Sequence, residues 1–385
     1  MRTADRISNL PPYLFAEIDR KKEAKVAQGI DVISLGIGDP DMPTPENIVR
    51  AMQKATENPA NHQYPSYFGA KRYREACSTW LKGRFDVDAD PNDEVLALIG
   101  SKEGIAHVFL AFVDPGDYTL VPGAGYPVYH TGGILCGGQT WWMPMTEEND
   151  FLADFESTPP EVLAKAKMMF LSYPNNPTSA IATPEYFDKA IAFARKHDLL
   201  LIHDNAYSEI GFDGYRPTSL LERPGAKDVA IELFSCSKAY NMTGWRIAFA
   251  AGNKDAIKAL GTVKSNIDSG AFTAVQDAAI EAMSGPQDIV FEMSEVYQRR
   301  RDIVLDALGK IGIEARVPKG TIYVWAKIPA GYDSASFATK ILEEANVIVA
   351  PGNAYGPSGE GYIRISLATP DDRLAEAIER IKNTL

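Results

Sequence analysis

Polar motifs follow several short apolar segments of this sequence, at the points where the segments end. Their side chains are a helix-start anion cradle, amides, a carboxylate, a phenol, hydroxyls, a lysine and an arginine. The motifs are Gly100-Ser101-Lys102-Glu103-Gly104, Pro174-Asn175-Asn176-Pro177-Thr178, Asp204-Asn205-Ala206-Tyr207, and Ser235-Cys236-Ser237-Lys238 with Arg246. Ligands of doubly wound sheets bind beyond the carboxyl ends of the strands. We therefore expect these groups to share one crevice.

This set of groups suits one kind of cofactor, an aldehyde that carries a phosphate and a pyridine ring. Serine hydroxyls, helix N–H groups and an arginine fork bind a phosphate monoester. A lysine amine with a lowered pKa forms a Schiff base with an aldehyde. A carboxylate such as Asp204 keeps a pyridine nitrogen protonated. Each residue alone has a simpler interpretation: Asp204 as a turn residue, Lys238 as a surface lysine, Asn176-Pro177 as a turn. The combination favours the cofactor site.

The elements that must position these residues follow an alternating pattern. Segments of helical periodicity, such as 184–197, separate short runs that are apolar nearly throughout, as in parallel strands covered on both faces. We predict an α/β fold with a large, doubly wound, mostly parallel sheet over residues 46–284. Residues 1–45 and 285–385 are predicted to form a smaller α+β domain from both chain ends. The apolar runs of the large sheet are 94–99, 118–121, 168–173, 199–203, 230–234 and 247–251.

Composition narrows the class of protein. The 385 residues carry 39 Lys and Arg against 51 Asp and Glu, a net charge of −12, which argues against broad attraction to nucleic acid or anionic lipid. The cysteines Cys77, Cys136 and Cys236 are odd in number and far apart, which fits a reducing compartment. The sequence shows neither a secretory signal nor an apolar run of membrane-spanning length, so we expect a cytoplasmic protein.

Other chemistries fit the sequence less well. The segment 36–41 begins like a dinucleotide fingerprint but lacks the third glycine, and Pro40 and Pro43 exclude a helix there. The five histidines show no metal-ligand spacing, so we expect no metal site. The run Arg299-Arg300-Arg301 is interpreted as the solvated face of a helix.

Taken together, the motifs resemble those of class I/II pyridoxal-phosphate-dependent aminotransferases of fold type I. The resemblance covers almost the whole chain in family order, and within the family it is nearest to the branch of LL-diaminopimelate aminotransferases. Besides the motifs above it rests on Tyr64-Pro65-Ser66-Tyr67-Phe68-Gly69, Gly244-Trp245-Arg246 and Tyr362-Ile363-Arg364-Ile365-Ser366, and for the branch on Tyr13-Leu14-Phe15, Leu35-Gly36-Ile37-Gly38-Asp39-Pro40-Asp41, His62-Gln63-Tyr64-Pro65-Ser66-Tyr67, Ile105-Ala106-His107 and Gly125-Tyr126-Pro127-Val128-Tyr129.

The resemblance implies a role for each motif residue. Lys238 would be the catalytic Schiff-base lysine, and Asp204 would pair with the pyridine nitrogen. Asn176 and Tyr207 would bind the phenolic oxygen of pyridoxal 5'-phosphate, and Tyr126 would stack on its ring. The phosphate would be held by Ser101, Lys102, Ser235, Ser237 and Arg246, together with Tyr64 from the partner subunit of a homodimer with shared active sites. Substrate would contact Tyr13, Gly38, Lys102, Tyr126, Asn176, Asn266 and Arg364, the last as the clamp on the α-carboxylate.

The implied activity is ping-pong amino transfer between an amino acid and a 2-oxo acid. In the suspected branch, tetrahydrodipicolinate becomes LL-diaminopimelate for lysine biosynthesis, with glutamate and 2-oxoglutarate as the other pair. Alanine or aspartate aminotransferases of related branches carry similar motifs and remain alternatives, ahead of a C–S lyase or an aminotransferase-like regulator. One position departs from the family: Ser179 stands where glycine is usual, and a serine fits there if its φ is negative.

Overall fold

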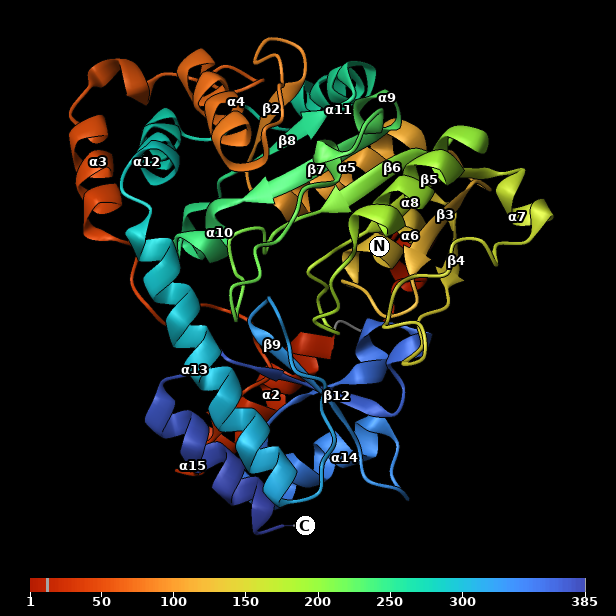
Figure 1. Ribbon diagram of the computed structural model, residues 1–385, viewed down its shortest axis with the longest axis vertical. Helices are drawn as coiled ribbons and strands as arrows, with labels where there is room; N and C mark the ends of the chain where they lie inside the picture. Colours follow the sequence, from red (N-terminus) through yellow and green to blue (C-terminus); the bar gives the residue numbers. More distant parts are fainter. Residues whose placement is uncertain (12–13, 385) are drawn as a thin grey trace.

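The computed structural model describes the backbone of residues 1–11 and 14–384, and the side chains of residues 1–11 and 20–384. Among these residues, the largest sheet has seven strands in the order β2-β8-β7-β6-β5-β3-β4 (Figure 1). Strand β8 is antiparallel to both neighbours, and the other pairs are parallel. This confirms the predicted α/β class. The strands are β2 Val95–Leu98, β3 Tyr118–Pro122, β4 Gln139–Met143, β5 Ala166–Leu171, β6 Leu200–Asp204, β7 Ala230–Ser235 and β8 Ala248–Gly252.

Helices cover both faces of this sheet, which is why its strands are apolar nearly throughout. Alternate residues of β5 face opposite sides: Met168 and Phe170 pack in one core cluster, and Met169 and Leu171 pack in the other. The first cluster contains residues of α5 Ser101–Phe112, α6 Val128–Cys136 and α11 Lys254–Ile267. The second contains residues of α4 Lys71–Phe85, α8 Pro184–Lys196 and α12 Thr273–Ser284.

A smaller unit lies below the large sheet in Figure 1, reached through the long helix α13 Asp288–Lys310. Its antiparallel sheet has the order β11-β12-β9, and β1 pairs with β10 in parallel. Ile33 and Leu35 from the N-terminal segment share a buried cluster with residues of this C-terminal sheet. The boundaries at residues 45 and 285 stay a prediction. The elements are α2 Leu14–Val26, β1 Ile33–Ser34, β9 Tyr323–Lys327, α14 Ser334–Lys340, β10 Val347–Ile348, β11 Ala350–Pro351, β12 Tyr362–Ser366 and α15 Asp371–Lys382.

The interpretation of the arginine run as a solvated face is wrong for two of its three residues. Arg300 and Arg301 on α13 are 4% and 3% exposed. Arg300 pairs with Asp41 at 2.7 Å and with Asp371 at 2.8 Å. Arg301 pairs with Asp213 at 2.5 Å. Buried guanidinium groups need such partners, and the partners come from distant parts of the chain that local periodicity cannot show.

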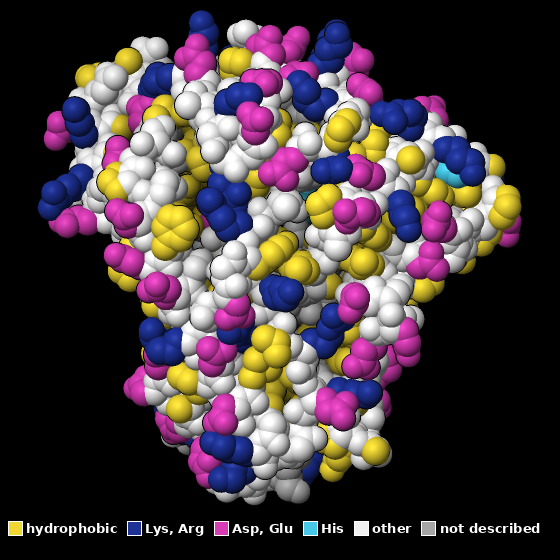
Figure 2. Space-filling model, viewed as in Figure 1, with side chains coloured by type: hydrophobic (Ala, Val, Ile, Leu, Met, Phe, Trp, Pro, Cys, Tyr) yellow, Lys and Arg dark blue, Asp and Glu magenta, His cyan; other side chains and the backbone are white. Residues whose placement is uncertain are grey.

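The surface is mixed in charge. On the face shown in Figure 2, Lys and Arg side chains are interspersed with Asp and Glu. Across residues 1–11 and 14–384, no helix combines the length and the apolar character that crossing a bilayer requires. Cys77, Cys136 and Cys236 are all free.

Candidate active site

A cavity of about 410 Å³ lies at the carboxyl ends of the parallel strands of the large sheet, where the small unit faces them. Most residues singled out from the sequence line it, contributed by both units and by the segment between them. They are Gly38, Ser101, Lys102, Tyr126, Asn176, Asp204, Tyr207, Ser235, Ser237, Lys238, Arg246 and Arg364.

One end of the cavity is built to hold an anion. Helix α5 begins at Ser101, and its first N–H groups are preceded by Gly100 at φ +103°. A Cβ on Gly100 would lie 2.2 Å from Arg246 Nη2, so only glycine allows this close approach. Ser235 caps the helix α10 Cys236–Ala239, since its Oγ accepts the N–H of Ser237 at 3.2 Å. Hydroxyls, helix N–H groups and a guanidinium therefore line the same cavity.

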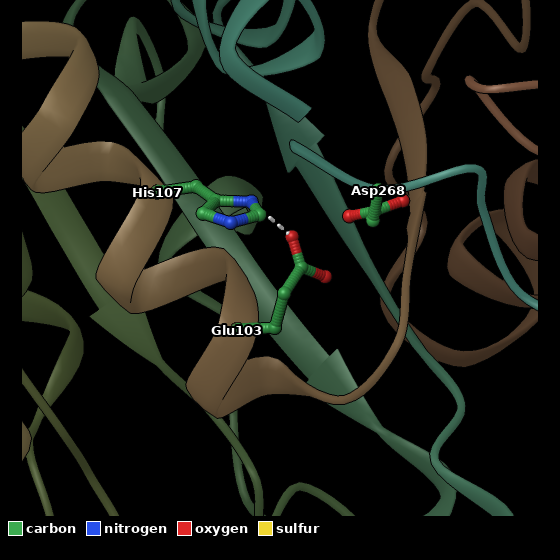
Figure 3. Close-up of side chains that lie close together, drawn as sticks. All are labelled: Glu103, His107 and Asp268. Atoms are coloured by element: carbon green, nitrogen blue, oxygen red, sulfur yellow. Dashed lines mark ion pairs between the residues drawn. The ribbon is translucent and has the colours of Figure 1, made fainter. Parts of the chain in front are cut away.

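A largely buried polar cluster lies beside the start of α5, where the anion-binding groups are found. Glu103 and His107 of α5 point toward Asp268, which follows α11 (Figure 3), and Glu103 Oε1 lies 2.5 Å from His107 Nδ1. The other Glu103 oxygen accepts the N–H of Ile99 at 2.9 Å. The buried Lys264 ammonium donates to both Asp268 oxygens at 2.8 Å and lies 3.6 Å from Glu103. Because Lys264 joins Asp268 of the α11 end to Glu103, and Glu103 binds the backbone just before α5, we assign the cluster to holding the start of α5.

Lys238 stands one turn beyond β7, with its ammonium partly buried in the cavity. Its Nζ donates to the carbonyl of Gly38 at 2.5 Å. Burial lowers the pKa of Lys238, and the nearby Arg364 and Arg246 guanidinium groups lower it further. A lysine with a lowered pKa loses its proton at a lower pH than an exposed lysine does, which favours nucleophilic and proton-transfer roles.

Asp204 ends strand β6 and is 6% exposed. Burial raises the pKa of this carboxyl to about 6, against the hydrogen bond from Tyr129, which lowers it. Its Oδ2 accepts that bond from the Tyr129 hydroxyl at 2.8 Å. Within the described part of the chain, the buried Oδ1 has no hydrogen-bond partner. One oxygen of this pocket-lining carboxylate is thus fixed, and the other is available to a ligand.

Arg364 of β12 reaches the opposite side of the cavity. Its guanidinium donates to Asn176 Oδ1 at 2.8 Å and to the carbonyl of Gly36 at 2.6 Å. It also lies 4.0 Å from the ring centre of Tyr323. The turn that presents Asn176 is shaped by Asn175, whose Oδ1 accepts the N–H and the hydroxyl of Thr178. A guanidinium held in this way has the planar fork that suits a carboxylate.

Two predicted site residues that the structure describes do not line the cavity of this chain, and a third falls on a residue that it does not describe. Tyr64 is 90% exposed, and Asn266 is exposed with its amide bonded to the carbonyl of Thr262 on its own helix. Tyr13 lies outside the described residues. Their roles stay predictions.

The condition set for a serine at position 179, a negative φ, is not met, since Ser179 adopts φ +58°. Its side chain accounts for the exception: Ser179 Oγ is hydrogen-bonded to Thr321 Oγ1 and to the carbonyl of Tyr323, both at 2.8 Å. These bonds tie the Asn176 turn to the small unit, which offsets the cost of a left-handed serine.

Sequence reasoning missed Tyr129, Thr243 and Tyr323, all of which line the cavity. The Tyr323 hydroxyl accepts a hydrogen bond from Tyr207 at 3.0 Å. Tyr129 lies three residues after Tyr126, but Tyr126 precedes α6 and Tyr129 lies in its first turn, so helical spacing does not relate the two. Tyr323 sits in an apolar strand whose sequence gives no sign of the site.

Comparison with known proteins identifies the class. Residues 30–381 match the family described as aminotransferase class I and II. The chain belongs to this family, whose members use pyridoxal phosphate as cofactor.

More specific likenesses extend over the full length. The chain is 54% identical to an LL-diaminopimelate aminotransferase of Aquifex aeolicus, covering 99% of this chain and 98% of that protein. It is 55% identical to one of Desulforudis audaxviator, covering 99% and 97%. Among solved structures, substrate-bound BacF from Bacillus subtilis aligns with a TM-score of 0.95 at 39% identity, over 100% and 98% of the two chains. Aspartate aminotransferase from Thermus thermophilus with maleate aligns at 0.91 and 29%, over both whole chains.

Proposed function

We propose that this enzyme is an LL-diaminopimelate aminotransferase that exchanges amino groups between LL-diaminopimelate and 2-oxoglutarate. In the biosynthetic direction it converts tetrahydrodipicolinate to LL-diaminopimelate on the route to lysine. The observation that carries the proposal is the identity of 54–55% to relatives of that name over 97–98% of their length. The cavity agrees with a carboxylate-bearing amino acid as substrate, because Arg364 and Lys102 both line it.

The residues of the cavity fit pyridoxal phosphate. We assign the phosphate to the start of α5 with Ser101, Ser235, Ser237 and Arg246, where a side chain on Gly100 would block the approach of Arg246. We assign the ring nitrogen to Asp204, whose buried Oδ1 has no partner among the described residues. Tyr126 is assigned to the ring face, and Asn176 and Tyr207 to the phenolic oxygen.

When bound there, the cofactor supplies an electron sink that acidifies the Cα–H bond of an amino acid. The Arg364 fork orients that amino acid through its α-carboxylate. Lys238 Nζ, neutral more readily because burial lowers its pKa, accepts the Cα proton and returns one when the second keto acid is converted. Asp204 holds the ring nitrogen in its protonated form. One pocket serves both substrates in turn, so ping-pong kinetics are expected.

Absorption spectra of the holoenzyme test the substrate assignment. LL-diaminopimelate or glutamate, added singly without a keto acid, should convert the yellow enzyme to a colourless form, whereas alanine and aspartate should not. Bleaching by alanine or aspartate alone would keep the aminotransferase class and exclude the diaminopimelate assignment.

Lys238→Ala should abolish turnover while the fold and noncovalent phosphate binding persist. Near-normal transamination by that variant would overturn the assignment of the catalytic lysine.

A substrate with carboxylates at both ends calls for a second cation besides Arg364. We assign this role to Lys102, whose Nζ lies 5.9 Å from the ring centre of Tyr126. Lys102→Met should raise the KM for LL-diaminopimelate and glutamate by about tenfold or more and leave the inhibition constant of alanine, which does not bleach the enzyme, nearly unchanged. Steady-state kinetics with the three amino acids decide the matter: equal losses for all of them would refute the role of Lys102.

We propose further that the enzyme is a homodimer in which Tyr64 reaches the partner's phosphate site. Tyr64, Tyr67, Phe68, Ile267 and Phe272 are exposed and apolar, which suits a protein interface. Subunit mixing tests the sharing of sites. Alone, the Lys238→Ala enzyme is expected to be inactive and the Tyr64→Ala enzyme to be weakly active. After exchange, heterodimers contain one intact site, so about a quarter of all sites regain activity. A mixture no more active than the average of its parents would exclude the exchange of Tyr64 between subunits.

A cytoplasmic location is also proposed, because the three free cysteines suit a reducing compartment. Cell fractionation would test it.

A further inference from the structure

Tyr129 is a buried tyrosine in the wall of the cavity. It lies at the start of α6, is 2% exposed and lines the pocket beside Tyr126. Its ring stacks on Phe170, with the ring centres 4.9 Å apart and the planes at 15°. The edge of Tyr126 meets it at 6.0 Å and 83°. Two aromatic contacts therefore fix where the Tyr129 hydroxyl lies.

That hydroxyl donates to Asp204 Oδ2 at 2.8 Å. The backbone of Asp204 is held as well, because the Ser172 hydroxyl donates to its carbonyl at 3.0 Å. The carboxylate thus has one constrained oxygen, while the other, Oδ1, is buried and has no hydrogen-bond partner in the part of the chain that is described.

We propose that Tyr129 is a positioning residue for the cofactor: it fixes Asp204 through Oδ2 so that Oδ1 stays ionised and in place to pair with the ring nitrogen. The inference rests on the assignment of Asp204 to that nitrogen. Tyr129 acts only through Asp204 and takes no proton in the reaction.

The electrostatics of the site agree with this role. Burial raises the pKa of Asp204, which opposes the ionised form that a protonated ring nitrogen requires. The Tyr129 hydrogen bond and the charge of His203, when protonated, lower it, whereas Tyr207, another titratable neighbour, is a neutral phenol because its own pKa is raised well above the usual value. Burial and the adjacent carboxylate raise the pKa of Tyr129 well above its usual value, so its hydroxyl remains a donor. Removal of this donor should leave Asp204 easier to protonate.

The decisive measurement compares two ligands on the apoprotein: pyridoxal phosphate and its analogue with CH in place of the ring nitrogen. Equilibrium dialysis gives both affinities, and their ratio reports the Asp204 contact alone. Tyr129→Phe removes one oxygen and keeps the stacked ring. We expect this variant to lower the ratio by about tenfold, as for loss of a hydrogen bond to a charged group. Equal weakening of both ligands would indicate a purely structural role and overturn the inference.

Two further variants separate the possible failures. Tyr73→Phe is the matched control, because Tyr73 is fully buried and donates to the carbonyl of Ala248 on the same sheet; its ratio should equal the wild-type ratio. Asp204→Asn should bring the ratio toward one. If Asp204→Asn lowers the ratio and Tyr129→Phe does not, only the role of Tyr129 fails. An unchanged ratio in Asp204→Asn would refute the underlying assignment.

A second readout needs no ligand. Infrared difference spectra against Asp204→Asn follow the titration of the Asp204 carboxyl in the apoprotein. The pKa of Asp204 should rise by about one unit in Tyr129→Phe, which corresponds to the same tenfold change. An unshifted titration would contradict the proposal even if the variant bound neither ligand.

Discussion

At the scale of single residues, Asp204 combines burial with a charge that the site needs. Such a group is favourable for ligand binding and unfavourable for the stability of the apoprotein. Because its folded-state pKa is raised to about 6, the folded chain binds a proton more tightly than the unfolded chain does. Asp204 therefore lowers the stability of the apoprotein progressively as pH rises from about 4 to about 6.

Asp204→Asn should therefore stabilise the apoprotein at neutral pH, by about 1–3 kcal/mol, while it weakens binding of pyridoxal phosphate. The Asn oxygen can still accept the Tyr129 hydrogen bond. Urea denaturation of wild type and variant across this pH range measures the effect, since the difference between them should grow with pH and then level off. If the difference in free energy of unfolding did not depend on pH, burial of Asp204 would carry no electrostatic cost.

At the scale of elements, a buried carboxylate joins the strand ends that carry the site. Glu232 of β7 is fully buried and accepts hydrogen bonds from His203 Nδ1 and Asn205 Nδ2, each at 2.7 Å, and from Ser219 Oγ. His203 Nε2 accepts the N–H of Tyr173 at 3.1 Å, so the ring proton lies on Nδ1 and is donated to Glu232. Strands β5, β6 and β7 are thereby fixed relative to one another beneath Asn176, Asp204 and Lys238.

Glu232→Gln keeps the shape of this side chain but places an amide among donors. We expect a loss of about 1–3 kcal/mol in the free energy of unfolding, as for buried donors left unpaired. Glu147→Gln, at a half-exposed residue that pairs with Lys327 at 3.5 Å, serves as the control and should change stability by no more than about 0.5 kcal/mol. Urea unfolding measures both, and equal effects would mean that the Glu232 network contributes nothing specific.

The elements also show what a sequence can predict. The six apolar runs became β2, β3, β5, β6, β7 and β8 because strands buried on both faces are apolar throughout. The seventh strand, β4, escaped notice because it lies at the sheet edge, where only Met143 is buried. The burial of Arg300 and Arg301 could not be predicted either, because each pairs with carboxylates that are distant in sequence and come close only in the folded chain.

At the scale of the whole molecule, both units contribute groups to the site. The residues assigned to pyridoxal phosphate belong to the large unit, whereas Arg364 belongs to β12 of the small unit. Most of these residues could be predicted from the sequence, because they belong to motifs that occur in the order known from a family. No sequence pattern indicated Tyr323, whose place depends on how the two units meet.

Arg364→Lys should separate the two functions. Lysine lacks the fork that donates to Asn176 and Gly36, so the KM for the amino acid should rise by about 10–100-fold. Affinity for pyridoxal phosphate should change by no more than about twofold. Steady-state kinetics and dialysis measure these effects, and Arg316→Lys, at a surface pair with Asp150, is the control. A parallel loss of cofactor affinity would show that the two units do not act separately.

The segment between the two units contacts the site through its backbone. Carbonyls of Gly36 and Gly38 accept hydrogen bonds from Arg364 and Lys238. A Cβ at Gly38 would lie 1.9 Å from the Tyr323 hydroxyl, whereas one at Gly29, upstream, would meet nothing within 4 Å, although the φ of +77° at Gly29 restricts that position to residues that adopt the left-handed region, such as Asn. In a saturation library of residues 29–41, tolerance should therefore follow Cβ clearance more closely than polarity, with Gly38 accepting almost no replacement. Evolutionary substitution in this segment is therefore limited by the space for a side chain, although its carbonyls bind two charged groups, Arg364 and Lys238.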